Sequence, residues 1–316
     1  MSNATTSAVR LANQRVLFTG AAGQLGSYLR PALLRAGATV VGTGSRPGPG
    51  VDLVADVTDR DAVRRALVEA APDLVVHGAA YTDVDGAERD PARAAVVNIE
   101  GARNVALAAR EVGAWLVAVS TDFVFSGLGG APDAEDAATD PVSVYGRTKR
   151  DGELAVLEID PRFAVARTAW LYGGAGKHFP RTVLAVIAAR GSIEVVDDEI
   201  GSPTFAGDLA DALAELAAVR PSGIVHLINE GRATRFELAQ AVTTAVGRLA
   251  ESVRPTTTTA FLAKYPLPAK RPADSQLLNQ QAAALGIRLR SWREAVEAYA
   301  PRLAAESGMH GDREER

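Results

Sequence analysis

A tyrosine and a lysine four residues apart, Tyr145 and Lys149, are the side chains whose types and spacing best suit chemistry. On a helix this spacing puts both on one face, close enough for the ammonium to act on the phenol. An unperturbed phenol titrates near pH ~10, so a cation that lowers its pKa would make it a better proton donor or acceptor at neutral pH. Such pairs also occur by chance on solvated helices, so the spacing has meaning only in context.

The context is the stretch Ser-Thr-Asp-Phe-Val-Phe-Ser-Gly at 120–127. Residues 117–119, Val-Ala-Val, have the pattern of the end of a buried strand, so Thr121 and Asp122 are expected where that strand opens into a loop. Ligands of parallel sheets bind at such strand ends. The Thr121 hydroxyl could hold a carbonyl oxygen beside Tyr145 while hydride arrives at carbon. These residues predict a site for carbonyl reduction.

Composition narrows the function classes. The 316 residues contain no cysteine and four histidines without metal-ligand spacing, and the formal net charge is -4. Thiol nucleophiles and disulfides are excluded, no metal site is expected, and there is no basic footprint for nucleic acid. Apolar runs are too short for a membrane span, and the start lacks the apolar core of a signal peptide. We therefore expect a soluble cytoplasmic protein without nucleic-acid or membrane partners.

Near the start, a short apolar strand at 16–18 is followed by a glycine-rich loop and an apolar helical pattern at 28–36. Strand, glycine loop and helix in this order are the context of a dinucleotide site, because glycine lets the backbone approach a diphosphate and the helix offers free N–H groups. The glycines stand three apart, which departs from the G-x-G-x-x-G spacing. The predicted cofactor residues of this loop are Gly20, Gly23, Gln24, Leu25 and Gly26.

The next strand, 39–42, ends without the acidic residue that usually meets the ribose 2′-hydroxyl in NAD-specific proteins. Arg46 could instead hold a 2′-phosphate, which favours NADP(H) over NAD(H), or it could be a solvated loop charge. Asp56, followed by Val57, could accept from the adenine amino group or cap the helix predicted at 61–70. Small residues after the strand at 74–77 would allow close approach to a cofactor, and these are Ala79 and Ala80, followed by Tyr81.

Alternating strands and helices predict an α/β fold with a Rossmann-type doubly wound parallel sheet. We expect an NAD(P)-binding domain at 15–170, with 223–250 returning to it as a strand and a helix behind the sheet. Loop-rich stretches at 171–222 and 251–300 predict a smaller substrate-binding lobe. The ends, 1–14 and 305–316, are expected to be disordered tails. Asn98, in a helix predicted at 93–112, could bridge to neighbouring loops or lie on the helix surface.

From about residue 15 to residue 300 the chain resembles the dTDP-4-dehydrorhamnose reductase branch of the extended short-chain dehydrogenases/reductases. No single motif identifies this family, but the six motifs that follow identify it together. The motifs that carry the resemblance are Gly-Ala-Ala-Gly-Gln-Leu-Gly (20–26), Ala-Ala-Tyr-Thr-Asp-Val-Asp-Gly-Ala-Glu (79–88), the 120–127 stretch, Arg-Thr-Ala-Trp-Leu-Tyr-Gly (167–173), Asp-Asp-Glu-Ile-Gly-Ser-Pro-Thr (197–204) and Lys-Arg-Pro-Ala-Asp-Ser (270–275).

The resemblance implies that NAD(P)H reduces the C4 ketone of dTDP-4-dehydro-L-rhamnose to give dTDP-L-rhamnose. Carried over by motif, Tyr145 is the proton donor, and Lys149 holds the nicotinamide ribose and tunes the phenol. Thr121 and Asp122 meet the sugar. The resemblance implies a dTDP-4-keto-6-deoxysugar as the bound partner. A homodimer is a further possibility for the assembly of the protein.

Two further side chains are implied at the substrate end. By this resemblance, Trp170 provides an indole that packs on the deoxysugar. The alternative is that Trp170 is a residue of the core. Arg271 is a candidate diphosphate contact or a surface ion pair. The chain departs from the family pattern at four positions, Phe123 for tyrosine, His178 for asparagine, Glu199 for glutamine and Arg235 for tryptophan.

Because of these departures, the residues predict the type of reaction but leave the identity of the sugar open. One alternative is a sister 4-ketoreductase that acts on another dTDP-4-keto-6-deoxysugar for an antibiotic or a glycan. A second, of another class, is a non-catalytic regulatory subunit that binds a dinucleotide. Intact Thr121, Tyr145 and Lys149 argue against the second.

Overall fold

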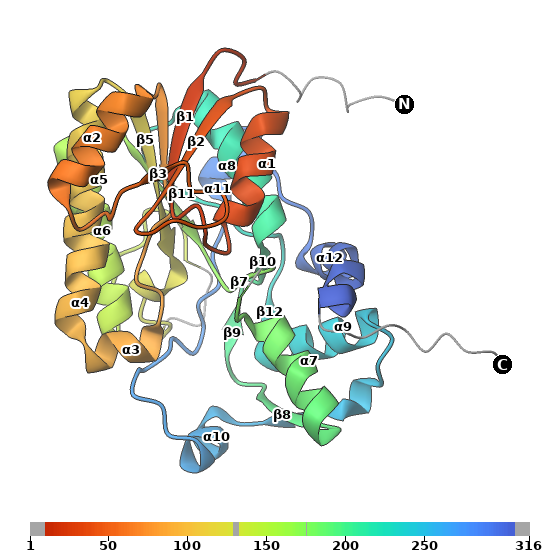
Figure 1. Cartoon of the computed structure of the whole chain (residues 1–316). Coiled ribbons are helices and arrows are strands. Elements are labelled where there is room, and N and C mark those ends of the chain that lie inside the picture. Colours follow the sequence, from red (N-terminus) through yellow and green to blue (C-terminus); the bar gives the residue numbers. More distant parts are fainter. Residues whose placement is uncertain (1–9, 129–132, 175, 307–316) are drawn as a thin grey trace.

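The computed structural model describes residues 10–128, 133–174 and 176–306 (Figure 1). Its centre is a seven-stranded sheet in the order β11-β6-β5-β4-β1-β2-β3, in which every pairing is parallel. The strands are β1 (Arg15–Thr19), β2 (Thr39–Gly44), β3 (Leu53–Val54), β4 (Leu74–His77), β5 (Trp115–Thr121), β6 (Ala164–Thr168) and β11 (Gly223–His226). This is the doubly wound order predicted from the sequence, with the direction of winding reversed between β1 and β4.

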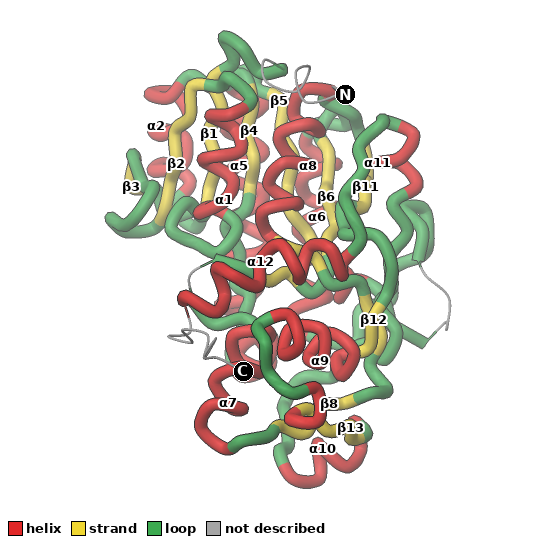
Figure 2. Tube along the Cα trace, turned by 90° about the vertical axis from the view of Figure 1, so that its right-hand side faces the viewer, coloured by secondary structure: helices red, strands yellow, loops and turns green. Residues whose placement is uncertain are grey.

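The strands are near-continuous apolar runs because helices cover both faces of the sheet. On one face lie α1 (Gly26–Arg35), α8 (Ala206–Val219) and α11 (Gln280–Ala284), and on the other lie α2 (Arg60–Ala70), α5 (Gly101–Glu111) and α6 (Val144–Ile159) (Figures 1 and 2). Register places Leu17 beside both Val41 and Val75, so one layer of the core crosses three strands. Each face has its own buried apolar cluster.

The smaller lobe lies beyond the carboxyl ends of the strands (Figure 1). Its core joins Tyr172, Trp292 and Tyr299 to apolar side chains of three helices. Those helices are α7 (Phe179–Arg190), α9 (Arg235–Ala245) and α12 (Trp292–Glu306), with α10 (Thr258–Lys264) at the far end. Short strand pairs complete it, formed by β7 (Leu171–Tyr172) with β10 (Thr204–Phe205), β9 (Ile200–Gly201) with β12 (Ala233–Thr234), and β8 (Ile193–Val196) with β13 (Val253–Thr256).

The helices divide between the two parts differently from the sequence-based expectation. Helix α8, expected in the lobe, packs on α1 beside the sheet, because its apolar side is buried with β6 and β11. Helix α9, expected behind the sheet, packs against α7 and α12 in the lobe. Helix α11, also expected in the lobe, covers the sheet as well, so two helices expected in the lobe belong to the nucleotide-binding part and one expected behind the sheet belongs to the lobe.

The ends of the fold also extend further than predicted. Leu11 is buried, and its N–H donates to the Ala36 carbonyl oxygen at 2.9 Å, so residues 10–14 belong to the fold. Helix α12 continues to Glu306. The remaining tail positions, 1–9 and 307–316, lie outside the described residues. Among the helices that are described, none is both long and apolar enough to cross a membrane.

Candidate active site

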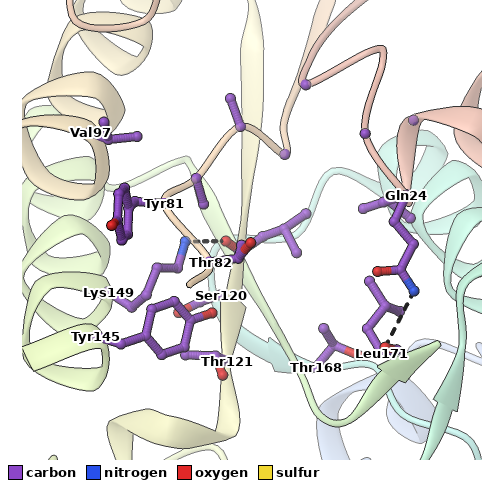
Figure 3. Close-up of a pocket in the computed structure, with 18 of the residues that line it drawn as sticks. Gln24, Tyr81, Thr82, Val97, Ser120, Thr121, Tyr145, Lys149, Thr168 and Leu171 are labelled. Atoms are coloured by element: carbon purple, nitrogen blue, oxygen red, sulfur yellow. Dashed lines mark hydrogen bonds between the residues drawn. The ribbon is translucent and has the colours of Figure 1, made fainter. Parts of the chain in front are cut away.

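A cleft of about 920 Å³ opens at the carboxyl ends of the strands, where the winding of the sheet reverses. Side chains and backbone from the ends of β1, β2, β4 and β5 line its wall on the sheet side, helix α6 contributes one flank, and the lobe closes the other end. Figure 3 shows its centre, with Tyr145 and Lys149 reaching from α6 toward Ser120 and Thr121 of β5. The predicted pair and the predicted strand end therefore meet in one cavity.

The glycine loop after β1 forms a tight cradle at one end of the cleft. Gly20 has a φ of 79°, and a Cβ on Gly26 would lie 2.4 Å from the Ala21 carbonyl oxygen, so neither position tolerates a side chain. The N–H groups of Gln24, Leu25 and Gly26 donate to no other group in the described part of the chain. Free N–H groups at the start of a helix fit the diphosphate of a dinucleotide.

Arg46 lines the cleft after β2 and makes no ion pair with another described residue. Asp52, the nearest carboxylate in sequence, is turned away, because it accepts from the Gly42 N–H at 2.7 Å and pairs with Arg30. This end of the cleft offers a guanidinium and no carboxylate, which fits a 2′-phosphate better than a free ribose hydroxyl.

Of the two roles predicted for Asp56, the helix cap is wrong, and the contact with the adenine amino group stays a prediction. Its carboxylate accepts from the Thr58 N–H and hydroxyl at 2.9 and 2.8 Å and does not line the cleft. The cap of α2 is Asp59, which accepts from Asp61 and Ala62 N–H groups. Val57, predicted beside it, does line the cleft.

The loop after β4 brings Ala79, Ala80 and Tyr81 to the cleft as predicted. It is anchored by Asn98, whose Oδ1 accepts from the Tyr81 N–H at 2.8 Å and whose Nδ2 donates to the Tyr81 carbonyl at 3.2 Å. Nδ2 also donates to Thr148 Oγ1 of α6 at 3.0 Å. A π-helical turn, Val96–Glu100, interrupts the helix predicted at 93–112 and places Asn98 in this buried position. The bridging alternative for Asn98 is confirmed.

Lys149 is buried on α6, and its Nζ donates to the Val119 carbonyl at 2.8 Å (Figure 3). Burial lowers the pKa of Lys149 to about 8, and the Glu153 carboxylate one turn later partly offsets that effect. Removing water from an ammonium disfavours its charged form. The lysine stays mostly charged at neutral pH and has hydrogen-bond donors left for a ligand.

Tyr145 is partly buried, and its pKa is raised to about 12. Burial is the main cause, the Asp122 carboxylate adds to it, and hydrogen bonding with the Thr121 side chain works in the opposite direction. The expected lowering of this pKa by Lys149 is not present in this arrangement, because the ammonium is directed to Val119. A phenol with this pKa is protonated at neutral pH and can donate.

Asp122 is buried at the start of the turn after β5, and the Thr121 hydroxyl donates to its Oδ1 at 3.0 Å. Burial raises its pKa to about 6, against the lowering effects of hydrogen bonds from Ser275 and Thr121 and the charge of Arg235. The carboxylate therefore fixes the Thr121 hydroxyl beside Tyr145. All four predicted reaction residues lie in one group.

Trp170 lines the cleft in a left-handed conformation with a φ of 45°, and its indole is in contact with two other residues of the lobe. The guanidinium carbon of Arg235 lies 3.5 Å from the ring centroid. Gly201 lies against the indole, where an added Cβ would be 2.3 to 2.6 Å from Cε2, Nε1 and Cζ2. Arg235 therefore occupies one face of the indole, and the packing of Trp170 on the sugar stays a prediction.

Arg271 forms an ion pair, which is one of its two predicted alternatives, and its contact with a diphosphate stays a prediction. It lines the cleft, and its guanidinium pairs with the Asp85 carboxylate at 2.7 and 3.4 Å. The same carboxylate accepts from the Ala269 N–H at 3.2 Å, which ties the start of α3 (Val84–Arg89) to the segment that crosses the cleft mouth. Three other lining residues were not predicted from the sequence to lie in the site, although Arg235 was noted as a departure from the family pattern, and these are Lys177, Phe179 and Arg235.

A doubly wound sheet with a dinucleotide cradle and a Tyr–Lys pair at the switch point defines the class of extended short-chain dehydrogenases/reductases. Among the residues that the structure describes, no group of acidic or histidine side chains could hold a metal ion.

The chain belongs to the family described as the RmlD substrate binding domain, whose model matches residues 14–305. It is 44% identical over 301 residues to a dTDP-4-dehydrorhamnose reductase of Streptomyces griseus, covering 93% of this chain and 95% of the relative. It is 45% identical over 297 residues to a probable dTDP-4,6-dihydroxy-2-methyloxan-3-one 4-ketoreductase of Streptomyces antibioticus, covering 92% and 97%. A solved dTDP-4-dehydrorhamnose reductase of Bacillus anthracis in complex with NADP superimposes with a TM-score of 0.84 at 34% identity, covering 92% and 99% of the two chains.

Proposed function

We propose that the protein uses NADPH to reduce the C4 ketone of dTDP-4-dehydro-L-rhamnose to the alcohol of dTDP-L-rhamnose. The observation that carries this is the placement of the Tyr145 phenol beside Thr121 and Lys149, in the cleft that begins at the glycine cradle. The similarity to dTDP-4-dehydrorhamnose reductases over nine-tenths of the chain supports the substrate, and the NADP complex of a relative supports the cofactor.

The binding roles follow from the cleft residues. The N–H groups of residues 24–26 would hold the cofactor diphosphate, and Arg46 would pair with the 2′-phosphate. Lys149 would donate to the ribose hydroxyls on the nicotinamide side, because its ammonium is fixed at the floor of the cleft by Val119. When bound, NADPH supplies the hydride.

The proton is moved by the protein. Tyr145 donates its phenolic proton to the C4 oxygen, and Thr121, which Asp122 holds in place in the free protein, would turn its single hydroxyl proton from Asp122 to the same oxygen. A positioned general acid contributes about 10² to 10⁴ in rate. Because Tyr145 needs no ionisation to act as an acid, its raised pKa leaves it in the proton-donating form at neutral pH.

A second candidate function is 4-keto reduction of another dTDP-4-keto-6-deoxysugar, and the similarity to the Streptomyces antibioticus ketoreductase favours it specifically. Both candidates use the same reaction residues. The two candidate functions are distinguished by the relative kcat/KM values for a panel of dTDP-4-keto-6-deoxysugars.

The test is Tyr145→Phe, with NADPH consumption followed by absorbance in the presence of the dTDP-4-keto sugar. We expect kcat to fall by about 10² or more while NADPH affinity stays within about twofold, since one hydroxyl is lost and little contact area. Tyr265→Phe is the matched control, because Tyr265 is 52% exposed at the end of α10 and far from the cleft lining. A Tyr145→Phe enzyme with more than half of the wild-type kcat would refute the assignment.

A further inference from the structure

The stack of Arg235 on Trp170 changes what the sugar end of the cleft can recognise. The guanidinium lies 3.5 Å from the indole centroid and 5.3 Å from the ring of Phe179, so it is held between two aromatic side chains. Glu199 fixes its Nε side at 3.7 Å, and the Arg235 N–H donates to the Glu199 carbonyl at 3.2 Å. Its position is therefore set by three neighbours before any ligand binds.

The donors of this guanidinium are only partly used. Glu199 pairs with Nε, and neither terminal nitrogen donates to an acceptor among residues 10–128, 133–174 and 176–306. The side chain keeps 20% exposure and lines the cleft. Stacking leaves the N–H groups of a planar guanidinium directed outward in its own plane, past the rim of the indole. Free, oriented donors thus face the sugar end of the cleft.

The neighbouring charged side chains do not compete for the same role. Arg271 already pairs with Asp85 through both terminal nitrogens. Asp122, whose charge acts on Arg235, accepts from the Thr121 hydroxyl. A ligand oxygen at this end of the cleft would find Arg235 as a donor with unfilled hydrogen-bonding capacity.

Building on the proposed function, we propose that Arg235 determines sugar specificity by donating N–H hydrogen bonds to a ring hydroxyl of the 4-keto-6-deoxyhexose. The protein should then prefer a sugar that keeps its hydroxyls at C2 and C3 over an analogue that lacks one of them. An analogue without the hydroxyl would leave a desolvated donor unpaired, and sites that hydrogen-bond a substrate hydroxyl reject such analogues strongly. An apolar indole face could not make this distinction.

The experiment compares Arg235→Leu with the wild type on three dTDP-4-keto-6-deoxysugars, namely the 2,3-dihydroxy sugar and its 2-deoxy and 3-deoxy analogues. We expect kcat/KM for the dihydroxy sugar to fall by about 10-fold to 100-fold in the variant, as for the loss of a charge-assisted hydrogen bond. For one of the deoxy analogues it should change by less than about threefold, so that the preference collapses. Arg235→Gln, which keeps a planar donor, should retain part of the preference.

Arg232→Leu is the matched control, because Arg232 is exposed directly before β12 of the lobe and its side chain forms no ion pair with another described residue. Its sugar preference should equal that of the wild type. Melting temperatures of all variants show whether Arg235→Leu folds, and Arg235→Gln carries the test if it does not.

Three results would overturn the inference. An equal loss on all three sugars would show a structural role, and an equal loss of affinity for dTDP itself would place the guanidinium on the diphosphate. Unchanged ratios in a variant that still turns over would also contradict it. If the wild type consumed NADPH with none of the sugars, the proposed function would fail first, and this inference with it.

Discussion

Replacing Asn98 with alanine should weaken both the fold and cofactor binding, because this one side chain joins the loop after β4 to the catalytic helix. It makes three hydrogen bonds, to the Tyr81 N–H, the Tyr81 carbonyl and the Thr148 hydroxyl, and it is 3% exposed. At about 0.5 to 1.5 kcal/mol for each net hydrogen bond, the loss is about 2 to 4 kcal/mol of unfolding free energy. Tyr81 lines the cleft, so a freed loop should raise the KM for NADPH by about 5-fold to 10-fold.

Asn104→Ala is the matched control. Asn104 is also a buried asparagine in the helix that follows the π-helical turn, but its amide makes one hydrogen bond, to the Val57 carbonyl at 3.0 Å. We expect it to cost about 1 kcal/mol and, because Val57 also lines the cleft but loses only one hydrogen bond at its carbonyl, to raise the KM for NADPH by no more than about twofold. Urea unfolding followed by circular dichroism gives the stabilities, and initial rates give the KM values. Equal destabilisation by the two substitutions, with an unchanged KM in Asn98→Ala, would show that the bridge is ordinary packing.

Two further predictions concern charge. Arg46→Ala should raise the KM for NADPH by about 10-fold and leave the KM for NADH within about twofold. The expected effect is modest because an ion pair between an exposed guanidinium and a phosphate adds little binding free energy. Equal effects on the two cofactors would reject the 2′-phosphate role. The pH profile of kcat/KM should fall below pH about 6, where Asp122 gains a proton and releases Thr121, and above pH about 8, where Lys149 loses its charge. Tyr145, with a pKa of about 12, stays protonated throughout. Asp122→Asn should remove the acid limb alone, and an acid limb that persists in this variant would contradict its origin in Asp122.

The sequence was sufficient to predict the sheet, because its strands are short apolar runs bounded by glycine, aspartate or proline. The strand at 74–77 was predicted with its observed bounds, and β1 and α2 to within a few residues. The packing of α8 and α9 could not be predicted, because both are apolar helices and the sequence pattern does not say which partner an apolar face meets. The packing of the whole chain decides which partner each of these helices contacts.

The site was predictable where a local motif carries it and not where distant segments meet. The glycine cradle and the pairing of β5 with α6 each follow from short stretches. The contacts of the indole do not, because Arg235 and Gly201 reach Trp170 from other strands and helices of the lobe. For Asp56, two aspartates stand close to the helix start, and composition alone does not say which one caps it; the structure assigns the cap to Asp59.

The winding of the chain between the sheet and the lobe constrains how this enzyme class can be recombined. The lobe is built from three stretches, 171–205, 233–264 and 292–306, and the chain returns to the sheet between them to add α8, β11 and α11. A chimaera that exchanged residues 171–306 as one block would therefore also replace the edge strand of the sheet and two of its covering helices. Grafting the sugar end of a relative onto this nucleotide site requires joins at both ends of the first two stretches and at the start of the third. On the ribosome, the same threading means that the core of the lobe, against which Trp170 and Phe179 pack, is completed only when α12, the last described helix, has been made.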